Sequence, residues 1–275
     1  MEKQQIKMIG LDLDGTLLNL ENKITDYTRK VLEQTIDKGI TVVVATGRPL
    51  TGIPKEIRLI PEIRYVLVSN GARVFDLKED QLVLEKLLLA EDVKRALTIL
   101  NSYDALREIV FHGVGYIQTD QMKKIEKYTT NPHMEKYVRE TRKTVDRLED
   151  MLRETKDGFD KINCVFLDSR ERKEAFNKMS GTGLALTYGN ERNMEINQKQ
   201  VNKGSSLIEL AKLLGIERQE VMAFGDGVND LEMLREVGLG VAMDNAMKEV
   251  KEVADTITYT NDQEGVARAI EQFVL

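Results

Sequence analysis

Apolar and polar positions alternate in the same way at both ends of the chain. Residues 6–11 form a short, largely apolar run, an amphipathic segment follows at 25–38, and further apolar runs occupy 41–45 and 65–68. Short apolar runs between segments of helical spacing are typical of parallel strands covered on both faces. The first part of the chain therefore predicts a doubly wound, Rossmann-like α/β fold built on a parallel sheet.

The same rhythm returns near the C-terminus. The predicted elements there are helices at 205–214, 231–237 and 265–273, and strands at 221–224, 239–242 and 256–258. We expect these strands to complete the sheet that the N-terminal part begins.

The middle of the chain follows a different pattern. Its predicted elements are helices at 90–103, 145–153 and 170–179, strands at 109–112, 116–119, 162–167 and 184–188, and a charged polar stretch after the second strand. These strands lack the acidic or Gly-rich ends of the outer ones. We therefore predict an inserted α+β domain at residues 85–189 and a core built from residues 1–84 and 190–275.

Acidic residues follow two of the predicted core strands. Asp12 and Asp14 come after the first strand, and Asp226 and Asp230 follow the strand at 221–224. The carboxyl ends of parallel strands share one rim, so these carboxylates are expected to meet there. Two carboxylates about 4 Å apart repel by roughly 4 kcal/mol at an effective dielectric near 20. Such a cluster implies a cation, and oxygen ligands without a Cys/His set favour Mg²⁺.

Each acidic segment also has a plainer interpretation. Asp14-Gly15 is a common surface turn, although a turn does not explain two acids flanking the apolar Leu13. Asn229 or Asp230 could cap the helix that follows, and capping is compatible with metal ligation.

Two further segments could bind an anion. Thr46-Gly47 ends a Val-rich strand, where a hydroxyl and backbone N–H groups could hold phosphate oxygens or simply cap a helix. Lys203 begins a predicted helix, where the macrodipole disfavours a cation. That position indicates an anionic partner for Lys203; a solvated surface lysine is the alternative.

Composition narrows the class of protein. A net charge of −6 and a pI near 5.3 argue against a nucleic-acid-binding surface. The one cysteine, Cys164, cannot form an intrachain disulfide, and with His112 and His133 it makes no zinc set. No apolar stretch approaches the roughly 18 residues of a membrane helix. Residues 1–5 show no secretory leader, so we expect a cytoplasmic protein without a membrane partner.

Five motifs occur in order along the chain. They are Asp12-Leu13-Asp14-Gly15-Thr16-Leu17-Leu18, Ala45-Thr46-Gly47-Arg48, Ser69-Asn70-Gly71-Ala72, Asn202-Lys203-Gly204 and Gly225-Asp226-Gly227-Val228-Asn229-Asp230. With these motifs the chain resembles the haloacid dehalogenase superfamily of phosphohydrolases over nearly its full length. The resemblance is to the Cof-type branch, in which a large class IIB cap is inserted after the third core strand. The cap carries no motif that points to a substrate.

The resemblance implies a role for each motif. Asp12 would attack phosphorus and become an aspartyl-phosphate, and Asp14 would protonate the leaving alcohol and later activate water. The transferring phosphoryl group would be held by Thr46, Gly47, Lys203 and Asn229. Mg²⁺ would be bound by the Asp12 and Asp226 carboxylates and the Asp14 backbone carbonyl, with Asp230 in support. Mg²⁺ and a lysine would let an anionic nucleophile approach a phosphate dianion.

The predicted activity is a Mg²⁺-dependent phosphatase of small phosphorylated metabolites, with sugar phosphates as the leading class. A phosphomutase acting on sugar phosphates is the enzymatic alternative, and it would yield an isomer in place of free phosphate. A non-catalytic sensor of a phosphorylated ligand is the alternative from another class. The presence of Asp12, Asp14, Lys203 and Asp226 together speaks against a sensor, because a pure binder needs no nucleophile.

Overall fold

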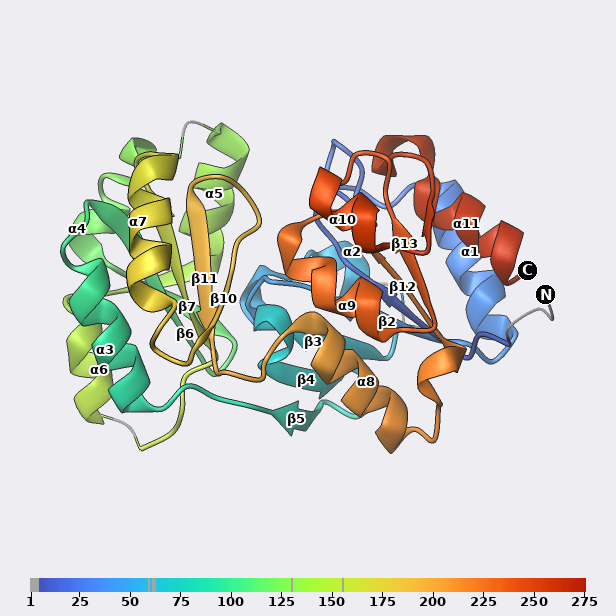
Figure 1. Ribbon diagram of the computed structural model, residues 1–275, viewed down its shortest axis with the longest axis horizontal. Coiled ribbons are helices and arrows are strands. Elements are labelled where there is room, and N and C mark those ends of the chain that lie inside the picture. Colours follow the sequence, from blue (N-terminus) through green and yellow to red (C-terminus); the bar gives the residue numbers. More distant parts are fainter. Residues whose placement is uncertain (1–4, 59, 61–62, 130, 155) are drawn as a thin grey trace. The chain divides into compact units, whose positions relative to one another are not determined.

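The computed structural model describes residues 5–275 apart from 59, 61–62, 130 and 155, and it divides into two compact units (Figure 1). The first unit contains the chain up to Gly47, Pro54–Glu85 and Asn202–Leu275. The second unit contains Arg48–Ile53 and Lys86–Val201. Each unit is built on its own sheet.

The sheet of the first unit is parallel over most of its width. Among the described residues its strand order is β14 (Thr256–Ile257), β13 (Leu239–Ala242), β12 (Val221–Gly225), β1 (Met8–Leu11), β2 (Thr41–Ala45), β3 (Tyr65–Val68), β4 (Arg73–Asp76) and β5 (Gln81–Glu85). Neighbours from β14 to β3 are parallel, whereas β4 and β5 add two antiparallel strands at one edge. The predicted fold class, a Rossmann-like core with an inserted domain, is confirmed.

Helices cover both faces of this sheet. The first unit contains α1 (Asp26–Asp37), α2 (Lys55–Arg58), α8 (Lys203–Leu213), α9 (Leu231–Glu236), α10 (Lys248–Val253) and α11 (Gly265–Phe273). The crossovers β1–α1–β2 and β12–α9–β13 run in opposite directions across the sheet. Right-handed crossovers in opposite directions put their helices on opposite faces. Accordingly, α1 packs with α11, and α9 packs with α8 (Figure 1).

The winding direction changes at β1. The chain runs from β1 to β2 and β3 on one side, and it returns as β12, β13 and β14 on the other. Such a switch point leaves a crevice beyond the carboxyl ends of the two central strands, which is where open α/β sheets bind ligands. Here those strands are β1 and β12.

The sheet of the second unit is largely antiparallel. Among the described residues its order is β10 (Ala185–Thr187), β11 (Asn193–Asn197), β9 (Lys161–Phe166), β6 (Ala105–Phe111), β7 (Val114–Gln118) and β8 (Arg142–Val145). Only the β7–β8 pair is parallel among these neighbours.

One face of the second sheet packs on the main apolar core of that unit. This core lies beneath α3 (Ala90–Leu100), α6 (Leu148–Glu154) and α7 (Ser169–Met179), and it includes Ile109, Ile162 and Phe166. A smaller apolar cluster on the other face includes Leu106 and Ile117 and packs on α4 (Thr119–Met122) and α5 (Pro132–Thr141). The rest of that second face carries charged and amide side chains.

The structure corrects several of the predicted elements. The sequence patterns do not predict β4, β5, α5 or β8. These strands lie at or next to a sheet edge and contain charged residues, and their apolar runs are at most three residues long. The helix predicted at 145–153 begins at Leu148, because Val145 ends β8.

The predicted domain division also needs correction. Residues 190–201, predicted to belong to the core, lie in the second unit because β11 pairs with both β9 and β10. Residues 48–53, also predicted to be core, belong to the second unit as well. The chain therefore passes between the units at four points and not at two.

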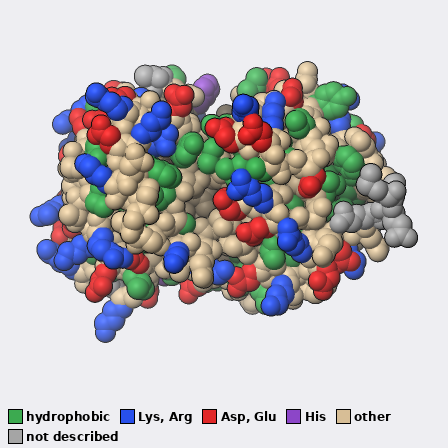
Figure 2. Space-filling view, viewed as in Figure 1, with side chains coloured by type: hydrophobic (Ala, Val, Ile, Leu, Met, Phe, Trp, Pro, Cys, Tyr) green, Lys and Arg blue, Asp and Glu red, His purple; other side chains and the backbone are tan. Residues whose placement is uncertain are grey.

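The surface charges and the lengths of the helices are relevant to which partners the protein could bind. Acidic and basic side chains are interspersed over the surface that Figure 2 shows. Within the described part of the chain, no helix is both long and apolar enough to cross a bilayer. Residues 1–4, part of the segment considered for a leader, lie outside the described residues.

Candidate active site

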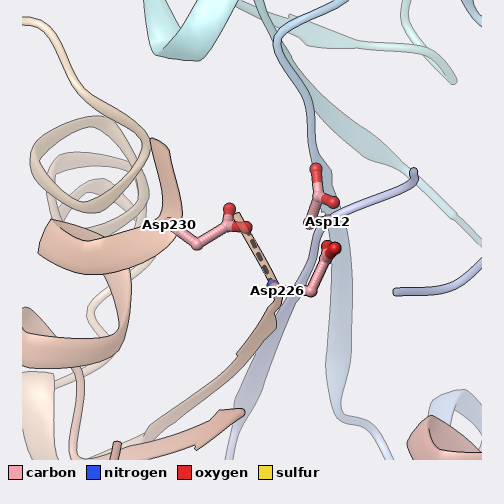
Figure 3. A group of neighbouring side chains, drawn as sticks. All are labelled: Asp12, Asp226 and Asp230. Atoms are coloured by element: carbon pink, nitrogen blue, oxygen red, sulfur yellow. Dashed lines mark hydrogen bonds between the residues drawn. The ribbon is translucent and has the colours of Figure 1, made fainter. Parts of the chain in front are cut away.

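Three carboxylates meet at the switch point between β1 and β12. Asp12 directly follows β1 and Asp226 directly follows β12, and the two strands pair in register through Leu11 and Phe224. The Asp12 amide donates a hydrogen bond of 3.2 Å to the Phe224 carbonyl, which continues that pairing. One oxygen from each of Asp12, Asp226 and Asp230 lies within 4.8 Å of the others (Figure 3). Three of the four acids expected to meet at this rim thus lie together, and Asp14 is not part of the group.

The turn after β1 holds Asp226 in place. Gly15 has a left-handed backbone with φ of +82°, and a Cβ there would lie 2.3 Å from Asp226 Oδ2. Glycine is thus required both for the turn and for the close approach. Thr16 Oγ1 donates a hydrogen bond of 2.9 Å to Asp226 Oδ1. The motif that carries Asp12 therefore also orients Asp226.

Lys203 joins the cluster from the first turn of α8. Asn202 caps this helix through its side chain, which accepts from the Ser205 amide at 2.7 Å. The fully buried Lys203 ammonium donates to Asp12 Oδ1 at 2.6 Å and to Asp230 Oδ1 at 2.7 Å. An anionic partner explains a lysine at the positive end of a helix, as its position in the sequence indicated.

Asp230 is held by several donors. Its Oδ2 accepts from the backbone N–H groups of Asp226 and Gly227, at 3.1 and 3.0 Å, while Oδ1 accepts from Lys203 (Figure 3). Both oxygens are therefore engaged by the protein. Asp230 is suited to orienting Lys203 and the loop, and Asp12 and Asp226 are the better placed direct ligands for a cation.

Burial dominates the electrostatics of the cluster. It raises the pKa of Asp12 well above its ordinary value, and Lys203 opposes this shift. Burial, together with Asp230, raises the pKa of Asp226 to about 6. Burial by itself lowers the pKa of Lys203, but the Asp12 and Asp230 carboxylates outweigh that effect and raise it. Lys203 is therefore a cation at neutral pH.

The residues present fit a divalent cation. Three carboxylates and one ammonium leave two negative charges uncompensated among these four side chains. The donor set consists of oxygen atoms only, which suits Mg²⁺ better than a metal that prefers nitrogen or sulfur. A bound cation would favour the ionised forms of Asp12 and Asp226 and so oppose the effect of burial.

The remaining predicted residues lie at the same rim in different surroundings. Asp14 is exposed, and its carboxylate is not part of the three-acid group found among the described residues. Thr46 is buried and follows β2, the strand next to β1. Gly47 is half-buried. The Asn229 amide donates to Asn70 Oδ1 at 3.4 Å, which ties the loop after β12 to the turn after β3.

The structure gives a role to two residues that belong to the five motifs but had no role assigned from the sequence. Thr16 is the donor to Asp226, and Asn70 is the acceptor for Asn229. Asn70 lies in a run of three residues, 69–71, that all have positive φ. Such a run is rare outside glycine and is often found at functional sites. Its sequence signal is the polar Ser-Asn-Gly that directly follows an apolar strand.

Residues 9–270 match the family model described as haloacid dehalogenase-like hydrolase. The chain belongs to this family. The match covers both units of this haloacid dehalogenase-like hydrolase, and it confirms the resemblance drawn from the five motifs.

Individual relatives agree with the family assignment. The hydrolase is 32% identical over 278 residues to the 5-amino-6-(5-phospho-D-ribitylamino)uracil phosphatase YcsE of Bacillus subtilis, covering 100% of this chain and 98% of the relative. It is 31% identical over 291 residues to the phosphatase YwpJ of the same organism, covering 98% and 100%.

Solved structures of similar proteins share the fold. A haloacid dehalogenase-like hydrolase from B. subtilis superposes with a TM-score of 0.86 at 28% identity, covering 98% of this chain and 100% of that one. The HAD subclass IIB sugar phosphatase BT4131 superposes with a TM-score of 0.83 at 25% identity, covering 97% and 98%. The expected cap class, IIB, is the class of this second structure.

Proposed function

We propose that this hydrolase releases phosphate from small phosphorylated metabolites through an aspartyl-phosphate formed on Asp12, with Mg²⁺ bound. The observation that carries the proposal is the placement of the Asp12 carboxylate. It is buried at the switch point, 2.6 Å from a fully buried lysine and beside two further carboxylates. Clustering this much negative charge is costly, and it is useful where a nucleophile and a cation must meet a phosphoryl group.

The chain's own residues divide the work of the reaction. Asp12 attacks phosphorus, and the exposed Asp14 donates a proton to the leaving oxygen and later takes one from the attacking water. Their surroundings suit these roles, because Asp12 is held by Lys203 whereas Asp14 can reach solvent. Thr46, Gly47, Lys203 and Asn229 hold the transferring phosphoryl group.

Asp12, Asp226 and the Asp14 backbone carbonyl would hold a Mg²⁺ ion, which would supply the charge neutralisation that lets the Asp12 carboxylate approach a phosphate. Thr16 orients Asp226 for this role, and Asp230 orients both Lys203 and the Asp226 backbone.

The relatives support a substrate class. YcsE is named for a substrate with a phosphorylated ribityl chain, and BT4131 is described as a sugar phosphatase. We therefore propose a phosphomonoester of a sugar or a sugar-like polyol as the substrate of this chain. The second unit acts as the cap that selects among such substrates, since all five motifs that carry the chemistry begin in the first unit.

A phosphate-release screen tests this proposal. Purified protein with Mg²⁺ is assayed against sugar phosphates, polyol phosphates, nucleotides and p-nitrophenyl phosphate, with Asp12→Asn as the matched control. We expect phosphate release by the wild type and none above background by the variant. Conversion to an isomer without phosphate release would indicate a phosphomutase. Absence of turnover across the whole panel would indicate a sensor, and either result refutes the proposal.

A further inference from the structure

Six residues that directly follow the predicted phosphate-binding turn belong to the second unit. Thr46 and Gly47 lie in the first unit, residues 48–53 lie in the second, and the chain returns to the first at Pro54. We call residues 48–53 the strap. The strap forms a short loop between Pro49 and Pro54, closed by a 2.8 Å hydrogen bond from the Gly52 amide to the Pro49 carbonyl. Both prolines restrict the backbone at the ends of this loop.

Hydrogen bonds attach the strap to the second unit. The Thr51 amide donates to the Gly113 carbonyl, in the turn between β6 and β7, at 3.1 Å. Thr51 Oγ1 donates to the Thr141 carbonyl, at the end of α5, at 3.1 Å. The strap is thus held by two separate elements of the second unit.

Stacking on Tyr137 adds a second attachment. The Arg48 guanidinium lies 4.7 Å from the centroid of the Tyr137 ring on α5, and it also donates to the Gly52 carbonyl at 3.0 Å. A cation over an aromatic ring is attracted by the ring's negative face. Gly52 passes so close to α5 that a Cβ at this position would lie 2.1 Å from Tyr137 Oη. Any larger residue at position 52 would therefore force the strap or the Tyr137 side chain to shift.

Tyr137 itself is part of a well-fixed group. The Arg142 guanidinium also lies 4.7 Å from the Tyr137 centroid. Arg142 donates to Glu108 Oε1 at 2.7 Å and to Thr141 Oγ1 at 2.7 Å, and the Arg142 and Glu108 side chains are both buried. The position of Tyr137 is therefore coupled to the sheet of the second unit through a buried ion pair.

The other end of the link is fixed in the first unit. The Thr46 amide donates to the Leu67 carbonyl at 2.9 Å, and the Thr46 carbonyl accepts from the Asn70 amide at 3.0 Å. Between Thr46 and Arg48 there is a single residue, Gly47. Two residues of extended chain span only about 7 Å, so little slack separates the two anchor points.

We propose that the strap links the second unit to the Thr46–Gly47 turn, so that seating of the strap on Tyr137 sets the geometry of that turn and its affinity for a phosphoryl group. Tyr137 is then a positioning residue, which acts through Arg48 and Gly47 without touching the substrate. This inference rests on the proposed function in one respect, the assignment of Thr46 and Gly47 to phosphate binding. The physical requirement for coupling is an element biased by both sites, and the strap is that element.

The experiment uses the full chain and three substitutions that weaken the contact of the strap with α5. Tyr137→Leu removes the stacking, Gly52→Ala introduces the clash, and Thr51→Val removes the hydroxyl hydrogen bond with little change of shape. Lys136→Ala, an exposed neighbour on α5, is the matched control. The readouts are the inhibition constant of inorganic phosphate, kcat and KM for p-nitrophenyl phosphate, and hydrogen exchange of the Thr46 and Asn70 amides.

We expect Tyr137→Leu and Gly52→Ala to weaken phosphate inhibition by about 3- to 30-fold and to speed exchange of both amides by a similar factor. Thr51→Val should change the phosphate inhibition constant and the exchange rates in the same direction, but by a smaller factor. Lys136→Ala should change neither. Amide exchange in β13 should be unaffected in all variants, because β13 lies away from β2 in the sheet.

A conservative rescue separates the strap from a general loss of structure. Tyr137→Phe keeps the ring for stacking and removes the nearest atom that a Cβ at position 52 would meet, the hydroxyl oxygen at 2.1 Å, leaving contacts of 3.1 Å or more. The double variant Gly52→Ala/Tyr137→Phe should therefore recover most of the phosphate affinity lost in Gly52→Ala alone, giving a clear coupling in a double-mutant cycle.

Two results would overturn the inference. One is phosphate inhibition and amide exchange within twofold of wild type in folded Tyr137→Leu and Thr51→Val. The other is a double variant no better than Gly52→Ala. Failure of the proposed function would look different: wild-type protein would release no phosphate, while the exchange of the Thr46 and Asn70 amides would still report whether the strap controls the turn.

Discussion

The two units place their charged residues in opposite ways. In the first unit, Asp12 and Asp226 lie just beyond the ends of apolar strands, and with Asp230 they outnumber the one lysine that contacts them. In the second unit, two buried ion pairs lie within the strands themselves, on one face of the sheet. Glu108 of β6 pairs with Arg142 of β8, and Lys161 of β9 pairs with Glu195 of β11.

The difference lies in how far each group is neutralised. In the second unit the buried Glu108 and Glu195 each have a basic partner, and amides complete the network: Asn163 donates to Glu108 Oε2 at 3.1 Å and accepts from Asn193 at 2.6 Å. A satisfied network of this kind fixes shape and offers no unmet demand for charge. The acidic group of the first unit keeps a net negative charge, which can bind a cation and react with an electrophile. Reactivity is therefore expected from the first unit and selectivity from the second.

The largest effect should come from removing the nucleophile. Asp12→Asn keeps the shape of the side chain but cannot form an aspartyl-phosphate, so kcat/KM should fall by about 10⁴-fold or more. Steady-state phosphate release measures this, and circular dichroism checks that the fold is retained. Phosphate release by the variant at a near wild-type rate would show that Asp12 is not the nucleophile. It would also contradict the assignment of reactivity to the acidic group of the first unit.

A smaller and more selective loss is expected at Asp14. Asp14→Asn should reduce turnover of alkyl phosphates by about 10²- to 10⁴-fold, the usual contribution of a general acid. The loss on p-nitrophenyl phosphate should be much smaller, because its leaving group needs little protonation. The ratio of the two losses is the measurement. Equal losses on both substrates would contradict the role of Asp14 as the acid.

Chelation tests the net negative charge directly. EDTA should lower turnover by about 10²-fold or more, since charge neutralisation by a metal is worth several kcal/mol in the transition state. Mg²⁺ should restore activity and Ca²⁺ should restore little, because Ca²⁺ takes more ligands at longer distances. Activity that is unchanged in excess EDTA would show that Lys203 alone neutralises the site.

Matched acid-to-amide substitutions should have opposite effects on stability in the two units. Glu108→Gln leaves the buried Arg142 without its carboxylate and should lower the free energy of unfolding by about 3 kcal/mol. Asp226→Asn in metal-free protein should leave the free energy of unfolding unchanged or raise it, on the order of 1 kcal/mol. The substitution removes a carboxylate that burial and the charge of Asp230 disfavour. Urea denaturation in EDTA measures both variants. Destabilisation of similar size in the two variants would mean that the acids of the first unit are structurally compensated too.

The pH dependence of the Asp226 effect follows from its pKa. Burial raises that pKa from 3.8 to about 6 in the folded state. An acid with a raised folded-state pKa stabilises the fold at low pH, and this stabilisation is lost as the pH rises through that window. The advantage of Asp226→Asn over wild type should therefore be present at pH 7.5 and should shrink as the pH falls from 6 towards 3.8.

Local sequence patterns predicted the parallel part of the first sheet well. β1, β2, β3, β12 and β13 are continuous apolar runs because helices cover both faces, and such runs are visible without knowledge of their neighbours. The same patterns failed at β4, β5 and β8. β5 and β8 are edge strands with no fully buried residue, and β4, although mostly buried, has only two apolar residues between Arg73 and Asp76.

Boundaries between the units were harder to predict for a related reason. β11 is an alternating strand whose assignment depends on its hydrogen-bonding partners, β9 and β10, and these lie upstream in the chain. The strap contains only a short 3₁₀ turn, Leu50–Gly52, and its place in the second unit comes from contacts with Gly113, Tyr137 and Thr141. Neither feature carries a local signal that assigns it to one unit or the other.

The sequence by itself determined the chemical inventory of this protein and the rim where it gathers. The four acids that follow apolar strands are Asp12, Asp14, Asp226 and Asp230, and Lys203 begins a helix. Parallel strands place their carboxyl ends at one rim of the sheet, so these acids are expected there together. Only the tertiary structure decided how these groups pair. Lys203 bonds Asp12 across 191 positions of sequence, and Thr16 bonds Asp226 across 210. Such pairings depend on distances and burial in the folded chain. A local sequence pattern contains no information about contacts between residues that lie so far apart in the chain.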